Sequence, residues 1–203
     1  MDTNGTVISL SLGDIILRPL DEEKDMDLLF EWRNDLTHLA LWMPQRYPVS
    51  KEEFKTEFER FQRTTEHIRL MIIRNGETVG TIYSYNCNLV HGWTYIATYL
   101  KPSSRNSGIG AKAWVLFVDY LFDNFPFRKV YCEVYGFNEL SLSTLNSGGL
   151  EVQAQLPEHI FWKNKYYDMY TMTMTRESAE TLNKQRLQRW RKNRNLSRLP
   201  HED

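Results

Sequence analysis

The stretch KPSSRNSGIGAKAW, from Lys101 to Trp114, carries two glycines one residue apart, directly before a run that is typical of a helix. A β-rich run, WTYIATYL, ends where this stretch begins, so the order is strand, loop and helix. The start of a helix presents unpaired backbone N–H groups, and glycine lets a bulky group approach the backbone closely. Arg105 adds a positive charge and Ser107 a hydroxyl donor. The stretch is therefore a candidate anion-binding loop.

The glycine spacing by itself does not identify the anion. The third glycine of a dinucleotide fingerprint is absent, because Ala113 stands in its place, and no Gly-Lys-Ser/Thr of a Walker loop occurs. A solvated turn before a glycine-tolerant helix start remains the alternative. The wider sequence has to decide between the two.

Strand and helix patterns alternate around this loop. An Asn-Gly pair at Asn75 and Gly76 separates two β-rich runs, which predicts a hairpin. Ser50 and Glu53 form a capping box, which predicts a helix from Lys51 to about Thr65. Further strands are predicted at residues 13–20, 93–100, 129–137, 159–164 and 166–175, with a turn at Asn164 and Lys165, and further helices at 21–35, 108–124, 138–149 and from Glu177 onward. No linker divides these elements, which indicates one mixed α/β domain.

The composition describes a globular chain without a strong overall charge. Its 203 residues are 41% hydrophobic, and the formal net charge is −1. Such a weak field does not drive non-specific binding to nucleic acid, so we expect no nucleic-acid partner. No apolar run approaches the roughly 18 residues of a membrane span, so no membrane association is predicted. The five histidines lack metal-ligand spacing, so no metal is predicted.

The chain has two cysteines, Cys87 and Cys132. Because no apolar export signal opens the sequence, we interpret them as reduced thiols and expect a cytoplasmic location. Cys132 alternates with Val130 and Val134 on a strand face predicted to be buried, and no histidine partner is evident. Neither cysteine is therefore expected to carry an acyl group.

The loop and its surroundings resemble the GNAT superfamily of acyl-CoA-dependent N-acyltransferases. The superfamily's pyrophosphate signature is Arg/Gln-x-x-Gly-x-Gly/Ala, and the run from Arg105 to Gly110 fits it. Other segments are similar to the branch of RimJ- and RimL-type ribosomal-protein, spermidine and amino-sugar acetyltransferases, in the family order from about Asp14 to Met174: LRPL, FEWRND, LWM, GETVGTI, KVYCEV, Asn138-x-x-Ser141 and NKYYDMYTM. The resemblance implies the GNAT fold, an α/β (α+β) fold whose mixed central β-sheet has splayed strands flanked by helices.

The resemblance also implies acetyl-CoA as the donor and assigns residues to it. In the family, the strand before the loop splays from its neighbour and pairs with the pantetheine arm, while backbone N–H groups of the loop hold the pyrophosphate. The Asn-x-x-Ser element contacts the far side of the pantetheine. The implied residues are Thr98, Tyr99 and Leu100 on the strand, Arg105, Asn106, Ser107, Gly108, Ile109, Gly110 and Ala111 in the loop, and Asn138 with Ser141.

Two catalytic positions depart from the family pattern. Many members carry a glutamate where this chain has Tyr95, and a tyrosine where it has Leu145. The catalytic candidates are then Glu133, which shares a strand face with Tyr131, and Ser141, which resembles the serine proposed as the acid in the RimL-type branch. A solvated or paired carboxylate is the alternative for Glu133, and a hydroxyl bonded to the cofactor is the alternative for Ser141.

Three residues are candidates for the acceptor pocket. Arg33 and Trp42 lie in the early segment that forms the acceptor side in the family, and Tyr95 replaces the usual glutamate. A tryptophan is more often part of a core, which is the alternative for Trp42.

The sequence therefore predicts an acetyl-CoA-dependent N-acetyltransferase, in which a primary amine attacks the thioester directly. The acceptor is a small amine, such as an amino sugar, polyamine or antibiotic, or a protein N-terminus, and the segment EWRND favours the small amine. The resemblance also allows a homodimer. The alternative is a non-enzymatic acyl-CoA-binding or RNA/ribosome-associated module, which the missing acid-base pair and a basic tail would suit.

That tail divides the chain into an acyltransferase domain, residues 1–175, and a basic amphipathic helix, residues 176–203. We expect Leu187 and Trp190 to dock on the domain, because a buried large side chain contributes about 1.5 to 3 kcal/mol. The alternative is that the basic residues of the tail bind a polyanion such as RNA.

Overall fold

An eight-stranded sheet runs through the computed structural model, which describes residues 10–62, 67–182, 184 and 185. The strand order is β1-β2-β3-β4-β5-β6-β8-β7. The strands are β1 (Leu10–Leu12), β2 (Ile15–Pro19), β3 (Arg69–Arg74), β4 (Glu77–Asn88), β5 (Trp93–Leu100), β6 (Lys129–Tyr135), β7 (Glu151–Trp162) and β8 (Lys165–Thr175). The helices are α1 (Glu22–Arg33), α2 (Lys51–Gln62), α3 (Ile109–Asn124) and α4 (Glu139–Ser147), with 3-10 turns η1 (Leu39–Leu41) and η2 (Pro102–Ser104). The mixed α/β prediction is confirmed.

The Asn-Gly turn and the capping box predicted from the sequence are both present in the structure. Asn75 and Gly76 both have positive φ, 51° and 82°, as the hairpin turn between β3 and β4 requires. At the start of α2, the Glu53 N–H donates to Ser50 Oγ at 3.2 Å, and the Ser50 N–H donates to Glu53 Oε2 at 2.8 Å. The predicted extension of α2 as far as Thr65 lies outside the described residues.

The β7–β8 hairpin differs from the prediction. β7 begins at Glu151 rather than His159, and the turn is Lys163-Asn164, both with positive φ, so that Lys165 already belongs to β8. β7 is an edge strand whose residues are mostly exposed, so its sequence carries little apolar alternation. Pro157 is tolerated there because the outer side of an edge strand needs no N–H donor.

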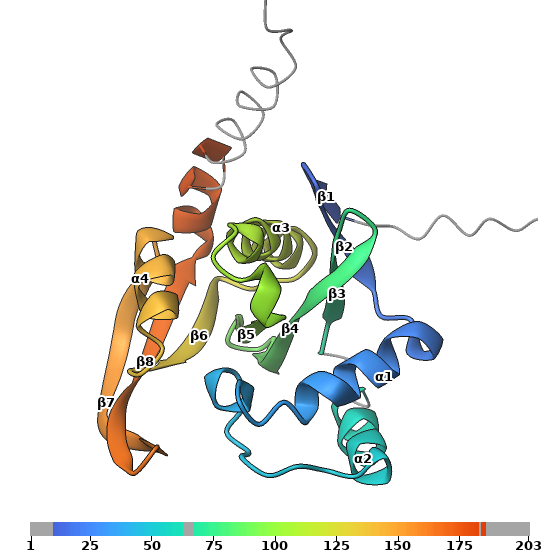
Figure 1. Ribbon diagram of the computed structural model, residues 1–203. Coiled ribbons are helices and arrows are strands. Elements are labelled where there is room, and N and C mark those ends of the chain that lie inside the picture. Colours follow the sequence, from blue (N-terminus) through green and yellow to red (C-terminus); the bar gives the residue numbers. More distant parts are fainter. Residues whose placement is uncertain (1–9, 63–66, 183, 186–203) are drawn as a thin grey trace, which may run out of the picture.

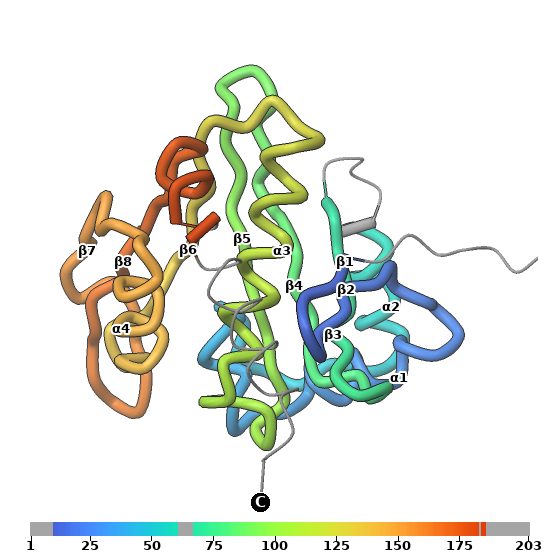
Figure 2. The backbone as a smooth tube through the Cα atoms, turned by 90° about the horizontal axis from the view of Figure 1, so that it is seen from above, coloured from blue at the N-terminus to red at the C-terminus, as the bar shows by residue number. Residues whose placement is uncertain are grey.

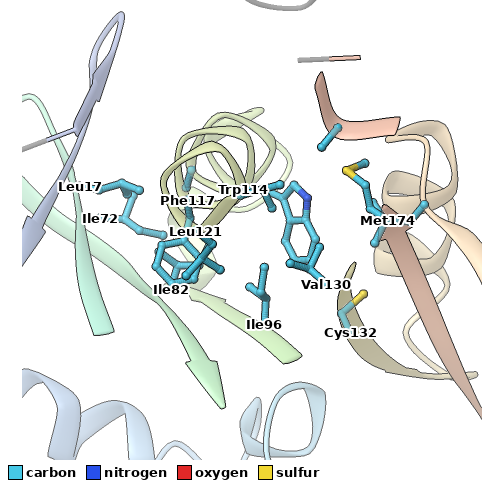
Figure 3. Close-up of a cluster of buried hydrophobic side chains, with 14 of the residues drawn as sticks. Leu17, Ile72, Ile82, Ile96, Trp114, Phe117, Leu121, Val130, Cys132 and Met174 are labelled. Atoms are coloured by element: carbon cyan, nitrogen blue, oxygen red, sulfur yellow. The ribbon is translucent and has the colours of Figure 1, made fainter. Parts of the chain in front are cut away.

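Helices cover both faces of the sheet (Figure 1). On one face, α3 packs its apolar side on strands β2 to β6, and this main core includes Ile82, Ile96, Phe117 and Leu121 (Figure 3). On the other face, α1 and α2 form a second core with β3 and β5 around Trp32, Phe54, Phe58, Met71 and Tyr99. Because side chains alternate along each strand, the two faces of the sheet differ in composition. The strands present mainly aliphatic side chains to α3 and more aromatic ones to α1 and α2.

The sheet splits between β5 and β6. The two strands run parallel and pair only from Trp93 to Tyr95 with Lys129 to Tyr131. From Cys132 onward β6 pairs with β8 alone, so β6, β8 and β7 swing away as a separate group with α4 (Figures 1 and 2). The edge of β5 that faces this group pairs with no strand from Ile96 to Leu100 within the described part of the chain, and the Leu100 carbonyl accepts from Arg105 Nε. This is the splay that the sequence predicts.

The first turns of the tail pack on the domain. Residues 176–182 are helical, Ala179 is buried in the main core, and Leu182 contacts it. Arg176 anchors the turn by donating to the carbonyl oxygens of Phe125 and Phe127, at 2.9 and 2.7 Å. Leu187 and Trp190 lie outside the described residues, so their docking stays a prediction.

Candidate active site

The anion-binding loop has the geometry that a phosphate requires. β5 ends at Leu100, η2 follows, and Gly108 caps the N-terminus of α3 with a φ of 76°. L-residues with a side chain rarely adopt that conformation, so the position favours glycine. A Cβ built on Gly108 would meet no atom within 4 Å, so the space beside the loop is open.

The loop also offers a row of free donors. Between the Arg105 N–H, which bonds Pro102, and the Lys112 N–H, which bonds Gly108, the backbone N–H groups of residues 106–111 have no partner among the described residues. Arg105 lies beside them, and its Nε donates to the Leu100 carbonyl at 3.0 Å. The hydroxyl of Ser107 donates to the Ser104 carbonyl at 2.6 Å, so Ser107 offers its backbone rather than its side chain. These groups fit the pyrophosphate of CoA.

Asn138 and Ser141 are joined by a hydrogen bond at the start of α4. Asn138 caps α4, and its Oδ1 accepts from the Ser141 N–H at 3.3 Å. The Ser141 hydroxyl has no hydrogen-bond partner within residues 10–62, 67–182 and 184–185. It is therefore available to a bound group, as the sequence-based assignment requires.

Five tyrosines gather around Glu133 on the face of the sheet opposite α3; we call Tyr83, Tyr85, Tyr95, Tyr131 and Tyr135 the tyrosine cluster. Tyr85 and Tyr95, on neighbouring strands, have ring centroids 5.3 Å apart, as do Tyr95 and Tyr131. The Tyr85 hydroxyl donates to Glu133 Oε2 at a long 3.5 Å. The Glu133 carboxylate is exposed, so an acceptor can reach it.

The phenols of this cluster stay protonated. Burial raises the pKa of Tyr85 far above its usual range, and the nearby Glu133 carboxylate raises it further. The same two causes, burial first, raise the pKa values of Tyr95 and Tyr135, the latter opposed by Arg46. The site thus combines one carboxylate with neutral phenols and aromatic rings, a combination that attracts a cation such as an ammonium.

Of the three residues predicted to line the acceptor pocket, Tyr95 and Trp42 lie on the acceptor face of β5, whereas Arg33 is used in the core. Tyr95 lies beside Glu133 in the tyrosine cluster, and Trp42 packs on Tyr99, with ring centroids 4.9 Å apart. Trp42 Nε1 and the Tyr99 hydroxyl are buried and have no partner in the described part of the chain. Arg33 does not join them, because its side chain is 2% exposed. Its guanidinium already binds both carboxylate oxygens of Glu57, at 3.0 and 3.1 Å, and the carbonyl oxygen of Tyr47.

Cys132 has no access to the site. It is 4% exposed and lies in the main core beside Val130 and Trp114 (Figure 3). Burial, aided by Glu133, raises the pKa of its thiol to about 12, so almost no thiolate forms at neutral pH. Cys87 contacts the hydroxyl of Thr94 at 2.9 Å, and neither cysteine forms a disulfide within the described residues. Direct transfer without an acyl-cysteine stays a prediction.

Sequence reasoning missed Tyr83, Tyr85 and Arg69. The signal was present, because Tyr83 and Tyr85 alternate in β4 and the Asn-Gly turn fixes which residues of β3 they face. Arg69 and Tyr83 are register partners, and the Arg69 guanidinium carbon lies 4.2 Å from the centre of the Tyr83 ring.

Comparison with known proteins decides the family. The family model of the acetyltransferase (GNAT) domain matches residues 14–151, more than half of the chain. The chain belongs to the GNAT acetyltransferase family. This GNAT chain is also similar to the SPbeta prophage-derived N-acetyltransferase YokL of Bacillus subtilis, at 26% identity over 175 residues that span 86% of each chain.

Solved structures share the fold of this GNAT chain. The spermidine N-acetyltransferase of Vibrio cholerae, in complex with CoA and spermine, has a TM-score of 0.76 at 17% identity over 82% of this chain and 98% of that one. RimL, a ribosomal-protein α-N-acetyltransferase in complex with CoA, has a TM-score of 0.74 at 14% identity over 84% and 99%. The predicted fold and the GNAT family are confirmed, and at the level of its family the chain is an N-acetyltransferase.

Neither a membrane helix nor a metal cluster is found in the described residues. No helix in residues 10–62, 67–182 and 184–185 is both long and apolar enough to span a bilayer. The same residues hold no group of three or more histidine, cysteine, aspartate or glutamate side chains arranged to bind a metal.

Proposed function

We propose that this GNAT enzyme acetylates the primary amine of a cationic acceptor, which is received at Glu133 in the split between β5 and β6. The observation that carries the proposal is the position of Glu133 within the tyrosine cluster. It lies on β6 just beyond the last β5–β6 pair, opposite the unpaired edge of β5. An amine held there would lie beside the strand that is assigned to the pantetheine arm.

In this proposal, the loop before α3 and the free edge of β5 bind acetyl-CoA. Bound acetyl-CoA supplies an activated thioester. The N–H groups of residues 106–111 and the guanidinium of Arg105 bind the pyrophosphate, and residues Thr98 to Leu100 offer their unpaired backbone edge to the pantetheine. Trp42 packs on Tyr99 and fixes this strand from the acceptor side. Positioning the two reactants in this way accounts for much of the rate enhancement that such a site can provide.

Proton transfer falls to two side chains. An ammonium cannot attack a thioester until it loses a proton, and the Glu133 carboxylate accepts that proton as the amine adds to the carbonyl carbon. As the C–S bond breaks, the hydroxyl of Ser141, which has no other partner among the described residues, donates its proton to the departing sulfur and takes up the second proton that the adding nitrogen loses. CoA then leaves as the thiol, the amide is neutral and Ser141 is unchanged. Tyr85 and Tyr95 keep their protons and line the ammonium site with aromatic rings.

Thiol release tests the proposal. Acetyl-CoA is mixed with the protein and with amines of increasing positive charge, namely hexylamine, putrescine and spermidine, and free thiol and acetylated amine are both quantified. We expect amine-dependent thiol release, with one acetylated amine formed for each thiol released. Tight CoA binding with no transfer to any amine, nor to any peptide N-terminus, would favour the non-enzymatic acyl-CoA-binding module instead.

Two finer expectations accompany this function. Two cysteines that form no disulfide within the described residues suit a reducing compartment, so we place the enzyme in the cytoplasm. A homodimer stays a prediction, and the exposed apolar side chains of the β7–β8 hairpin, Val152, Leu156, Phe161 and Tyr166, are its candidate surface. The mass of the full-length protein in solution tests the dimer.

A further inference from the structure

Arg69 has no carboxylate partner among the described residues. It begins β3, and its only contact of note is the face of the Tyr83 ring, 4.2 Å from the guanidinium carbon. Within the described residues it makes no hydrogen bond and no ion pair, whereas Arg18, Arg33 and Arg74 each bind a carboxylate. The residue is half-buried, so part of its side chain is open to solvent.

An unpaired guanidinium in this position is unfavourable. Burial lowers the pKa of Arg69, which means that the surroundings oppose its charge. The face of the Tyr83 ring offsets part of this cost through a cation–π contact. An anion would offset more, because a guanidinium binds a carboxylate or phosphate through two parallel hydrogen bonds.

The strand register places Arg69 in the same row as Glu133. Arg69 pairs with Tyr83 on β4, and Tyr83 pairs with Ala97 on β5. The β5–β6 register ends at Tyr95 with Tyr131, and two residues further along lie Ala97 and Glu133. Side chains two residues apart share a face, so Arg69, Tyr83, Ala97 and Glu133 all lie on the acceptor face.

This row has a positive end and a negative end. Between them, Ala97 has the smallest side chain of the four and is half-buried rather than sealed. β3 and β6 are three strand positions apart, which at about 4.8 Å each gives roughly 14 Å between their backbones in a regular sheet, and the separation of β5 from β6 adds to this distance at Glu133. A free α-amino acid carries both charges on one carbon and is too short to reach both ends.

We propose that Arg69 binds an anionic group of the acceptor, so that the acceptor is an amine with a carboxylate or phosphate several bonds away from it. The inference rests on the proposed function, because it takes the amine to lie at Glu133. It narrows the acceptor class from cationic amines in general to long zwitterionic ones, such as ω-amino acids, short peptides or aminoalkyl phosphates. Arg69 then determines specificity, while Glu133 acts on the reacting amine.

The test compares acceptors that differ only in the distant charge. Aminooctanoate is compared with aminooctanamide, and aminooctyl phosphate distinguishes phosphate from carboxylate. We expect the wild-type enzyme to prefer the anionic acceptors by about tenfold or more in kcat/KM, as one charge-assisted hydrogen bond predicts. Arg69→Gln should bring this ratio close to one, and Arg69→Lys should restore part of it. Arg60→Gln removes the same charge from an exposed position on α2 and should leave the ratio unchanged.

A binding measurement separates this inference from the proposed function. Calorimetry of aminooctanoate with the CoA complex of each variant reports the Arg69 contact even where no turnover occurs. Weaker binding in Arg69→Gln, without turnover in any variant, would support the contact and reject the catalytic proposal. A wild-type enzyme that binds and acetylates acid and amide equally, or an Arg69→Gln variant that weakens both by the same factor, would overturn the inference and leave Arg69 as a support for Tyr83.

Discussion

Tyr95 and Tyr131 form the last residue pair between β5 and β6, and their ring centroids lie 5.3 Å apart. Beyond this pair the two strands separate, because β6 continues its hydrogen bonding with β8 alone. The free edge of β5, which we assign to the donor, and Glu133, which we propose as the acceptor carboxylate, therefore lie on opposite sides of one opening. In the proposed function, this arrangement brings the amine to the thioester without any covalent link to the protein.

The conformation of Gly108 gives the first prediction. Gly108→Val should lose roughly 1 to 2 kcal/mol of stability, because a side chain disfavours positive φ, and should also weaken CoA binding, because the new atoms occupy the open space beside the free N–H groups. Calorimetry with CoA measures the second effect.

Gly76→Val is the matched control. Gly76 also has a positive φ, 82°, and also has open space around its missing Cβ, but it lies in the β3–β4 turn. It should lose similar stability and keep its CoA affinity. Equal CoA affinity in both variants would argue against the loop assignment.

Arg33 should stabilise the fold rather than bind the acceptor. Arg33→Met leaves Glu57 without its partner and should cost roughly 3 kcal/mol of the free energy of unfolding, while KM for the amine at a temperature where the variant is folded should change little. Urea unfolding measures the loss, and a double-mutant cycle with Glu57→Gln assigns it to the pair. A large rise in KM for the amine, with normal stability, would show instead that Arg33 binds the acceptor.

Neither cysteine should take part in the transfer. The double variant Cys87→Ala, Cys132→Ala should retain amine-dependent thiol release once it is folded, because Cys132 is sealed in the core and an acyl-enzyme is not required. Mass spectrometry of the wild-type protein during turnover should find no acetylated cysteine. An acetyl group on either thiol that disappears when amine is added would contradict direct transfer.

Stability should fall at alkaline pH, and Cys132 should cause part of the fall. Its thiol ionises near its ordinary pKa of 9.0 in the unfolded chain and near about 12 in the native core. A raised native pKa contributes stability that is fully present below pH 9 and is lost between pH 9 and 12, by up to roughly 4 kcal/mol. Tyr99, whose pKa is raised to about 12 by burial, acts in the same direction.

Urea unfolding at a series of pH values measures this effect. Cys132→Ala should flatten the decline between pH 9 and 12, although the variant starts from a lower stability because it leaves a small cavity. An unchanged slope would show that Cys132 ionises normally in the folded protein.

The sequence predicted much of the fold because its signals are local. Asn75-Gly76, the Ser50 and Glu53 capping box and the helix start after Gly108 each act within a few residues, and each appears where it was predicted. β7 was misplaced because its exposed residues carry no alternation and its position depends on pairing with β8. The pairing of Arg33 with Glu57 and the row from Arg69 to Glu133 join residues far apart in sequence, which no local pattern reveals.

The most direct measurement compares kcat/KM of the wild-type protein and Glu133→Gln for a cationic amine, with CoA affinity measured in parallel. We expect the wild-type enzyme to acetylate the amine and Glu133→Gln to lose about a hundredfold or more in kcat/KM, because glutamine cannot take the proton, while CoA affinity stays the same. Glu151→Gln removes the same charge from exposed β7 and should match the wild type. Full activity in Glu133→Gln would contradict the central claim that the amine is received and deprotonated at Glu133.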